Sequence, residues 1–146
     1  MNKCTLEEQI NRTGKLLQTT VGSSMEPMLK NRQNVVAFEK PTEILKKYDL
    51  PLYKRPDGKY VLHRILKVRE NDYIICGDNR CEKEIVPHDW VIGVTTGYYK
   101  DGNWILVTDK NYQKYLKTLP FRRKKIWIKT LYYRAKRKLR NVIHEK

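Results

Sequence analysis

One serine in this sequence stands where a nucleophile could be held. Residues 22–29 read Gly-Ser-Ser-Met-Glu-Pro-Met-Leu, so small turn-forming residues precede Ser24 and Pro27 restrains the backbone shortly after it. Met25 and Met28 are apolar and can anchor the far side of such a turn. A stiff turn can present a hydroxyl at a fixed angle to a carbonyl carbon, as nucleophilic catalysis requires. The alternative is an ordinary surface turn that follows a strand.

Two further segments follow the serine in the chain. Residues 60–66 read Tyr-Val-Leu-His-Arg-Ile-Leu and residues 76–80 read Cys-Gly-Asp-Asn-Arg. The three segments resemble, in the same order, the nucleophile, base and Gly-Asp-Asn segments of the signal peptidase and LexA-like serine peptidase superfamily. A histidine in the second segment resembles the archaeal and endoplasmic-reticulum signal peptidases, whereas the bacterial type usually has lysine there. The resemblance covers about residues 22–96 and implies a serine endopeptidase that cleaves an extended peptide of leader or signal type.

The resemblance also assigns roles to individual residues. Ser24 is the expected nucleophile and His63 the expected general base. The neighbouring Arg64 cannot be the base, because a guanidinium stays protonated at working pH. Asp78 is the first candidate for the acid that orients His63. Glu84, a few residues past the third segment, is the alternative, and a site that uses neither acid is a third reading.

The oxyanion of the reaction needs a hydrogen-bond donor beside the nucleophile. The backbone N–H of Ser24 is the expected donor, with the Ser23 hydroxyl as a lesser helper. Many signal peptidases carry a hydroxyl two residues before the nucleophile. Gly22 occupies that position here, as is common in the LexA-like branch. We expect no cofactor and no metal ion.

The elements that must position these residues are mostly strands. Thr5 and Glu8 form a capping-box pattern that predicts a helix over about residues 6–16, broken near Gly14. Short apolar runs separated by turn signals then predict strands. These runs are residues 18–21, 34–38, 50–54, 60–68, 73–76, 90–96 and 104–108. We therefore expect a mainly β, signal-peptidase/LexA-like catalytic domain with a short N-terminal helix and a basic amphipathic C-terminal helix.

The net charge of +15 is concentrated near the C-terminus. Residues 120–146 hold 11 Lys/Arg and 1 acid, whereas residues 1–119 hold 20 Lys/Arg and 15 acids. Pro120 is interpreted as the boundary between a peptidase domain, 1–119, and a basic helical tail, 120–146. Apolar residues recur at helical spacing in this tail, which favours an anionic membrane surface as its partner. Packing on the body and a protein partner are the alternatives; nucleic acid is unlikely, because no nucleic-acid-binding module is recognisable.

Length and composition limit the setting in which the chain works. The 146 residues suit one domain, and no apolar run approaches the roughly 18 residues of a membrane span. The N-terminus lacks the apolar core of a secretory signal. Three cysteines without a Cys-x-x-Cys pair indicate reduced thiols rather than disulfides or zinc. We expect a cytoplasmic protein, or one held peripherally on a membrane.

Two other functions are compatible with the same residues. One is a peptidase-like body without activity, a binding module that acts at a membrane surface through its basic tail. The other is a LexA-like self-cleaving regulator. It ranks last, because the stretch before Ser24 is too short for a DNA-binding domain and a cleavage linker, and because His63 replaces that branch's lysine.

Overall fold

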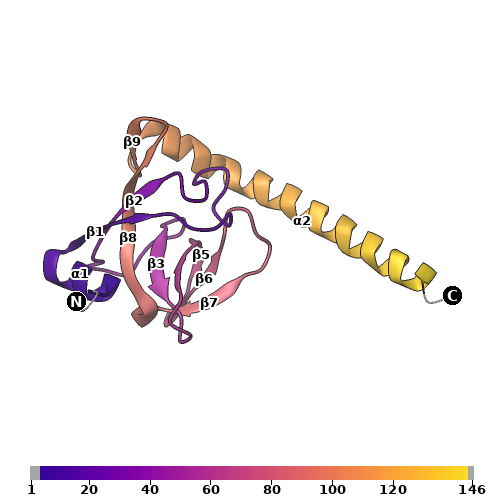
Figure 1. The fold of residues 1–146 in the computed structure, drawn as a ribbon, viewed down its shortest axis with the longest axis horizontal. Helices are drawn as coiled ribbons and strands as arrows, with labels where there is room; N and C mark the ends of the chain where they lie inside the picture. The colour runs from indigo at the N-terminus through magenta and orange to yellow at the C-terminus, as the bar shows by residue number, and fades with distance from the viewer. Residues whose placement is uncertain (1–3, 145–146) are drawn as a thin grey trace.

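A computed structural model describes residues 4–144, and its body consists of two β-sheets (Figure 1). The larger sheet has the strand order β1-β2-β8-β3-β4, and β9 pairs with β8. Its strands are β1 (Lys15–Thr19), β2 (Val35–Glu39), β3 (Pro51–Lys54), β4 (Tyr60–Leu62), β8 (Val91–Lys100) and β9 (Asn103–Leu106). The expected mainly β fold is confirmed at this level.

A smaller antiparallel sheet and three helical segments complete the fold. The smaller sheet has the order β5-β6-β7, with β5 at Arg64–Val68, β6 at Asp72–Cys76 and β7 at Glu84–Pro87. The helical segments are α1 (Leu6–Thr13), the 3-10 turn η1 (His88–Trp90) and α2 (Lys110–His144). A short helix near the N-terminus and a long one near the C-terminus thus flank the strands, as expected.

The capping box at the start of α1 is confirmed. The Thr5 side chain accepts a hydrogen bond from the backbone of Glu8, and the Glu8 side chain accepts one from the backbone of Thr5. The helix ends at Thr13, three residues before the predicted end. Gly14 adopts a left-handed conformation with φ of 74°, which closes the helix and lets β1 begin at the next residue.

The predicted single strand over residues 60–68 is wrong. The segment forms two strands, and the break between them falls at His63. Residues 60–62 form β4, which pairs with β3 in the larger sheet, whereas residues 64–68 form β5, which pairs with β6 in the smaller sheet. His63 is the one residue between them. It therefore lies at the junction of the two sheets.

The boundary expected at Pro120 does not begin a new element. Helix α2 begins at Lys110 and continues through Pro120. Its first turns pack on the body, where Tyr112 and Leu119 are buried. Apolar residues at positions 112, 115, 116 and 119 have the spacing of one helical face, which explains why the helix starts this early. Within residues 4–144, no helix is both long enough and apolar enough to cross a membrane.

Candidate active site

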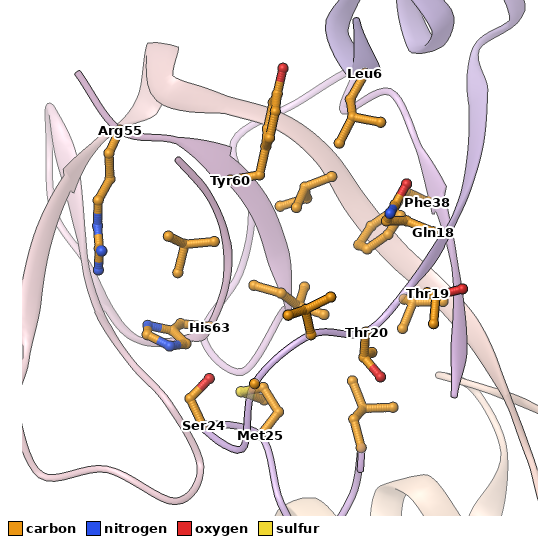
Figure 2. A pocket seen from close by; sticks show the side chains of 17 residues that line it. Leu6, Gln18, Thr19, Thr20, Ser24, Met25, Phe38, Arg55, Tyr60 and His63 are labelled. Atoms are coloured by element: carbon orange, nitrogen blue, oxygen red, sulfur yellow. The ribbon is translucent and has the colours of Figure 1, made fainter. Parts of the chain in front are cut away.

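A cavity of about 370 Å³ lies against the larger sheet, and both Ser24 and His63 line it (Figure 2). Its walls include the end of β1 and strand β4, which are the two edges of that sheet. Apolar side chains from other elements complete the lining, among them Leu6, Met25 and Phe38. The cavity is therefore apolar over much of its wall and hydroxyl- and imidazole-bearing at one end.

The expected nucleophile and base come together at that end. Figure 2 shows the Ser24 hydroxyl directed toward the imidazole ring of His63. Among the described residues, the hydrogen-bond contact of His63 is with Tyr53 and not with Ser24. Catalytic hydrogen bonds are often long before substrate binds. The two side chains are thus arranged as a serine and its base would be, 39 residues apart in the chain.

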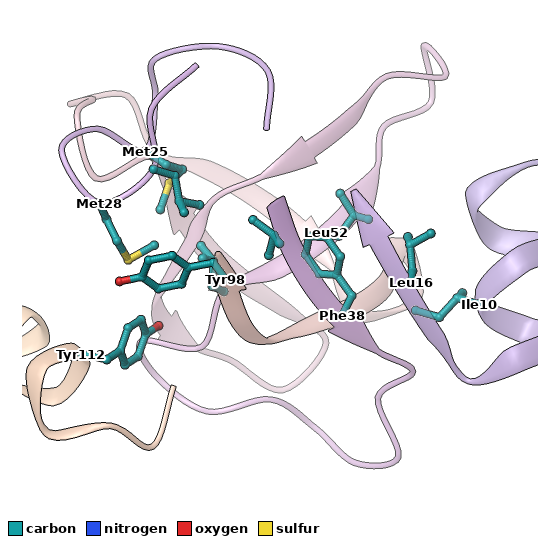
Figure 3. Packing of buried hydrophobic residues seen from close by; sticks show 11 residues of the cluster. Ile10, Leu16, Met25, Met28, Phe38, Leu52, Tyr98 and Tyr112 are labelled. Carbon is teal, nitrogen blue, oxygen red and sulfur yellow. The ribbon is translucent and has the colours of Figure 1, made fainter. Parts of the chain in front are cut away.

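The serine segment is fixed to the core by its two methionines. Met25 and Met28 are both 4% exposed. Figure 3 shows them on the side of the core where Tyr98 of β8 and Tyr112 of α2 also lie. Because these apolar side chains are buried in the core, they anchor the turn that carries Ser24 to the body. This agrees with the role expected of the methionines from the sequence.

The Gly-Asp-Asn segment holds the serine turn from the other side. The backbone N–H of Asn79 donates to the Ser24 carbonyl at 2.8 Å, and the Asn79 side chain donates to the Ser23 carbonyl at 3.2 Å. A Cβ at Gly77 would lie 2.7 Å from the Ser24 carbonyl oxygen, so glycine is needed for this approach. The first and third sequence segments therefore meet directly, with the third clamping the first.

Asp78 is used by Arg64 and not by His63. The guanidinium of Arg64 donates from Nε and Nη2 to the two oxygens of Asp78, each at 2.7 Å, and Tyr115 donates to the same carboxylate at 3.0 Å. Both side chains of the ion pair are almost wholly buried, at 0% and 1% exposure. Burial opposes the charge of Arg64, but the hydrogen bonds that Arg64 donates to Asp78 raise the pKa of the guanidinium. The hydrogen bond expected between Asp78 and His63 is absent from the described part of the chain, because the carboxylate is occupied elsewhere.

Arg64 also connects the three segments to the C-terminal helix. Its Nη2 contacts Met28 Sδ at 3.3 Å, and its Nη1 donates to the Tyr48 carbonyl and to the Tyr112 hydroxyl, each at 3.0 Å. Arg64 thus lies at the centre of a buried polar cluster, whereas its neighbour His63 lines the cavity.

Glu84 is the acid connected to His63, and the connection runs through a tyrosine. The Tyr53 hydroxyl donates to Glu84 Oε2 at 2.7 Å and lies 3.5 Å from His63 Nδ1. Arg55 donates from Nε and Nη2 to the two Glu84 oxygens, both at 2.7 Å. These hydrogen bonds, first that from Arg55, lower the pKa of Glu84. The carboxylate is therefore ionised and held rigidly beside the hydroxyl.

The position of the tyrosine proton determines the form of the histidine. A phenol has one proton, and the short contact with an ionised carboxylate places it between Tyr53 and Glu84. The remaining lone pairs of the Tyr53 oxygen then favour a proton on His63 Nδ1. The neutral imidazole in this tautomer carries its free lone pair on Nε2, which is the atom that a general base needs.

The surroundings of His63, the expected base, change its pKa. Burial lowers the pKa of His63 to about 4, against the opposing effect of the Glu84 charge. The imidazole is consequently neutral throughout the neutral pH range. An imidazole at its ordinary pKa would lose its proton just below neutral pH, whereas burial moves this step toward pH 4.

The backbone around Ser24 leaves an amide donor available. In the part of the chain that the structure describes, the Ser24 N–H donates no hydrogen bond, as an oxyanion donor requires before substrate binds. Ser23 does not line the cavity, and its carbonyl accepts from Asn79 and from the Glu26 backbone. Among residues 4–144, no group of three or more His, Cys, Asp or Glu side chains could hold a metal ion.

Comparison with known proteins adds no assignment to this geometry. No family model and no curated protein matches the chain.

Sequence reasoning missed Tyr53, Arg55 and the partner of Arg64. Tyr53 and Arg55 are two apart on an extended segment, which puts them on one face, but nothing in their spacing indicates contact with Glu84. The signal at Arg64 was stronger. A cation inside an otherwise apolar strand needs a buried acid, and Asp78 was available in the adjacent segment.

Proposed function

We propose that this chain is a serine endopeptidase of the signal-peptidase and LexA-like kind, in which Ser24 attacks and His63 takes its proton. The observation that carries the proposal is the meeting of Ser24 and His63 at one end of an apolar cavity bounded by two sheet edges. An enzyme of this class needs a nucleophile, a base, an oxyanion donor and a place for an extended substrate. Each has a candidate in this region of the molecule.

The substrate would bind as an added strand. Strands β1 and β4 are the edges of the larger sheet, and both contribute to the cavity wall. An extended peptide placed between them can use its backbone N–H and C=O groups to pair with either edge. Its side chains would alternate toward and away from the apolar wall, which favours apolar residues before the cut, and the family resemblance implies small ones there. This supports a leader- or signal-type peptide as the substrate class.

The chemistry follows from the placement of protons. His63 Nε2 removes the Ser24 proton as Oγ attacks the scissile carbonyl carbon, and the Ser24 N–H donates to the developing oxyanion. The protonated imidazole then gives its proton to the leaving amine, which separates as the acyl-enzyme forms. Water attacks this ester with His63 again as base, releasing the acid and the free serine. Glu84, acting through Tyr53, stabilises the imidazolium in both steps.

Cleavage of a peptide library is the direct test of this function. We expect the purified chain to cut extended peptides at bonds preceded by small or apolar side chains, with products identified by mass spectrometry. Ser24→Ala protein, prepared in the same way, is the control for contaminating proteases. Cleavage by both preparations, or by neither at concentrations where both are folded, would contradict the proposal.

Tyr53 is proposed as a positioning residue that carries the effect of Glu84 to His63. We expect Tyr53→Phe to lower kcat/KM by about 10- to 100-fold, because the preferred tautomer and the support of the imidazolium are both lost. Tyr99→Phe removes a tyrosine hydroxyl that contacts neither His63 nor Glu84, and it is the matched control.

The pH dependence separates positioning from a purely structural effect. Activity requires neutral His63, whose pKa is lowered by burial to about 4, so the wild-type rate should rise as pH increases through about 4 and stay level through neutrality. Glu84 raises the pKa of His63, so Glu84→Gln should move this rise to lower pH as well as lower the plateau. An unchanged midpoint in Glu84→Gln, with Tyr53→Phe fully active, would remove both residues from the mechanism.

A further inference from the structure

Helix α2 has one face that contacts the body. Tyr112 and Leu119 are buried, at 3% and 0% exposure. Further along, Arg123 donates to the Gly77 carbonyl at 3.4 Å, and the Thr130 hydroxyl lies 3.3 Å from Cys81 Sγ. At about 3.6 residues per turn, these positions fall on one side of the helix. Figure 1 shows that the helix then continues past the body.

The opposite face of α2 is apolar and exposed to solvent. Large apolar side chains lie there between 43% and 71% exposed. We call this the apolar stripe, and its residues are Phe121, Ile128, Leu131, Leu139, Val142 and Ile143. Helical geometry places all of them within a sector of roughly 120°, centred about half a turn from the body-facing residues. Lys124 falls within the same sector, so the uninterrupted part of the apolar stripe runs from Ile128 to Ile143. An exposed apolar surface of this kind marks an interaction site.

The charge of α2 is entirely of one sign. Its 35 residues include 13 Lys/Arg and no Asp or Glu. Lys125 and Lys136 lie along one border of the apolar stripe, and Lys138 lies along the other. Of the 13 Lys/Arg residues in α2, Arg134 is the one that forms a salt bridge within the described residues, with Glu82 at 3.4 Å. The charges that border the stripe therefore face solvent without an acidic partner inside residues 4–144.

We propose that α2 binds the surface of an anionic membrane, lying in the interface with the apolar stripe toward the acyl chains. Anionic headgroups match the basic borders, and the acyl region matches the stripe. Trp127 and Tyr132, both more than half exposed, are of the type that prefers the interfacial layer. Nucleic acid would neutralise the charges but leave the stripe in water. A protein partner would need both an apolar groove and acidic borders, and the α2 helix of a second copy has no acidic residue to supply them.

The proposal fixes the orientation of the body as well. Because the stripe lies opposite the body-facing side of α2, an interfacial helix keeps the two sheets on the aqueous side of the membrane. Membrane binding does not depend on the proposed peptidase chemistry, so Ser24→Ala should bind vesicles as the wild type does.

Vesicle sedimentation with the full chain tests the proposal. We expect binding to phosphatidylcholine vesicles that contain 30% phosphatidylserine, at least about 100-fold stronger than to pure phosphatidylcholine in 0.1 M NaCl. Raising NaCl to 0.5 M should lower the partition coefficient at least about tenfold, because surface charges are screened. Ile128→Gln/Leu139→Gln should lower it about 100-fold, since each buried apolar side chain contributes roughly tenfold.

Matched variants keep the result interpretable. Ile44→Gln/Ile85→Gln makes the same kind of change at two exposed body positions and should bind like the wild type. Circular dichroism of each protein checks that α2 stays helical, which glutamine favours nearly as well as leucine does. Equal binding to neutral and anionic vesicles would overturn the proposal. So would wild-type binding by the stripe variant, or a stripe-dependent dimer that does not sediment with lipid.

Discussion

Replacing Ser24 with alanine is expected to lower kcat/KM for a cleaved peptide by at least about 10⁴-fold. In the proposed mechanism the hydroxyl supplies the electron pair that forms the acyl-enzyme, and alanine has no group to replace it. The Ser24 side chain makes no hydrogen bond within the described residues, so the free energy of unfolding should change by less than about 0.5 kcal/mol. Peptide cleavage and urea unfolding, measured on the same preparation, check both parts.

His63→Ala should cause a comparable loss, and the double mutant should be little worse than either single one. Residues that act as one unit in a reaction are strongly non-additive, because removing either disables the same step. Ser23→Ala, at the neighbouring hydroxyl outside the cavity lining, is the control. If Ser23→Ala lost activity while Ser24→Ala kept it, the nucleophile would be wrongly assigned. Full activity in His63→Ala would require a different base.

Breaking the buried ion pair should have the largest effect on stability. Asp78→Asn and Arg64→Met should each lower the free energy of unfolding by about 3–5 kcal/mol, because each leaves a buried charge without its partner. The double variant Arg64→Met/Asp78→Asn should lose less than the sum of the two. Urea unfolding followed by circular dichroism measures all three proteins.

An exposed ion pair gives the comparison that this prediction needs. Lys15 and Glu39 lie 3.5 Å apart with side chains 77% and 50% exposed, and Glu39→Gln should cost less than about 1 kcal/mol. The result for Asp78 also decides between two roles. Asp78→Asn protein that stays as stable as the wild type but loses turnover would make Asp78 the acid of the reaction and would contradict the structural role argued from its contacts.

The parts of the fold that follow from local sequence were predictable. The capping box of Thr5 and Glu8 acts over three residues, and the strand runs show their own periodicity. The start of α2 was also readable, since Tyr112 and Leu119 belong to an apolar helical spacing that precedes Pro120. Proline favours a boundary by local rules, but the helix continues through Pro120 because residues before it, among them Tyr112 and Leu119, are buried against the body.

The parts of the site that depend on distant contacts were not predictable. Glu84 accepts hydrogen bonds from Tyr53 and Arg55, which lie 31 and 29 residues earlier in the chain. The spacing of apolar and polar residues in the sequence does not indicate such distant contacts. The two acids near the third segment could not be separated by sequence, because both are close to it. The two acids differ in their partners. Asp78 accepts hydrogen bonds from Arg64, whereas Glu84 accepts one from Tyr53, whose hydroxyl contacts His63.

The contacts of Arg64 also constrain the order in which the protein can be completed during synthesis. Its partner Asp78 is 14 residues away and becomes available once the β5-β6 hairpin has emerged. Tyr112, by contrast, is 48 residues further along the chain, and Tyr115 reaches Asp78 from the same helix. A nascent chain therefore holds an incompletely satisfied guanidinium behind the serine turn until the start of α2 has left the ribosome. Full assembly of the region around Ser24 therefore has to follow synthesis of the start of α2.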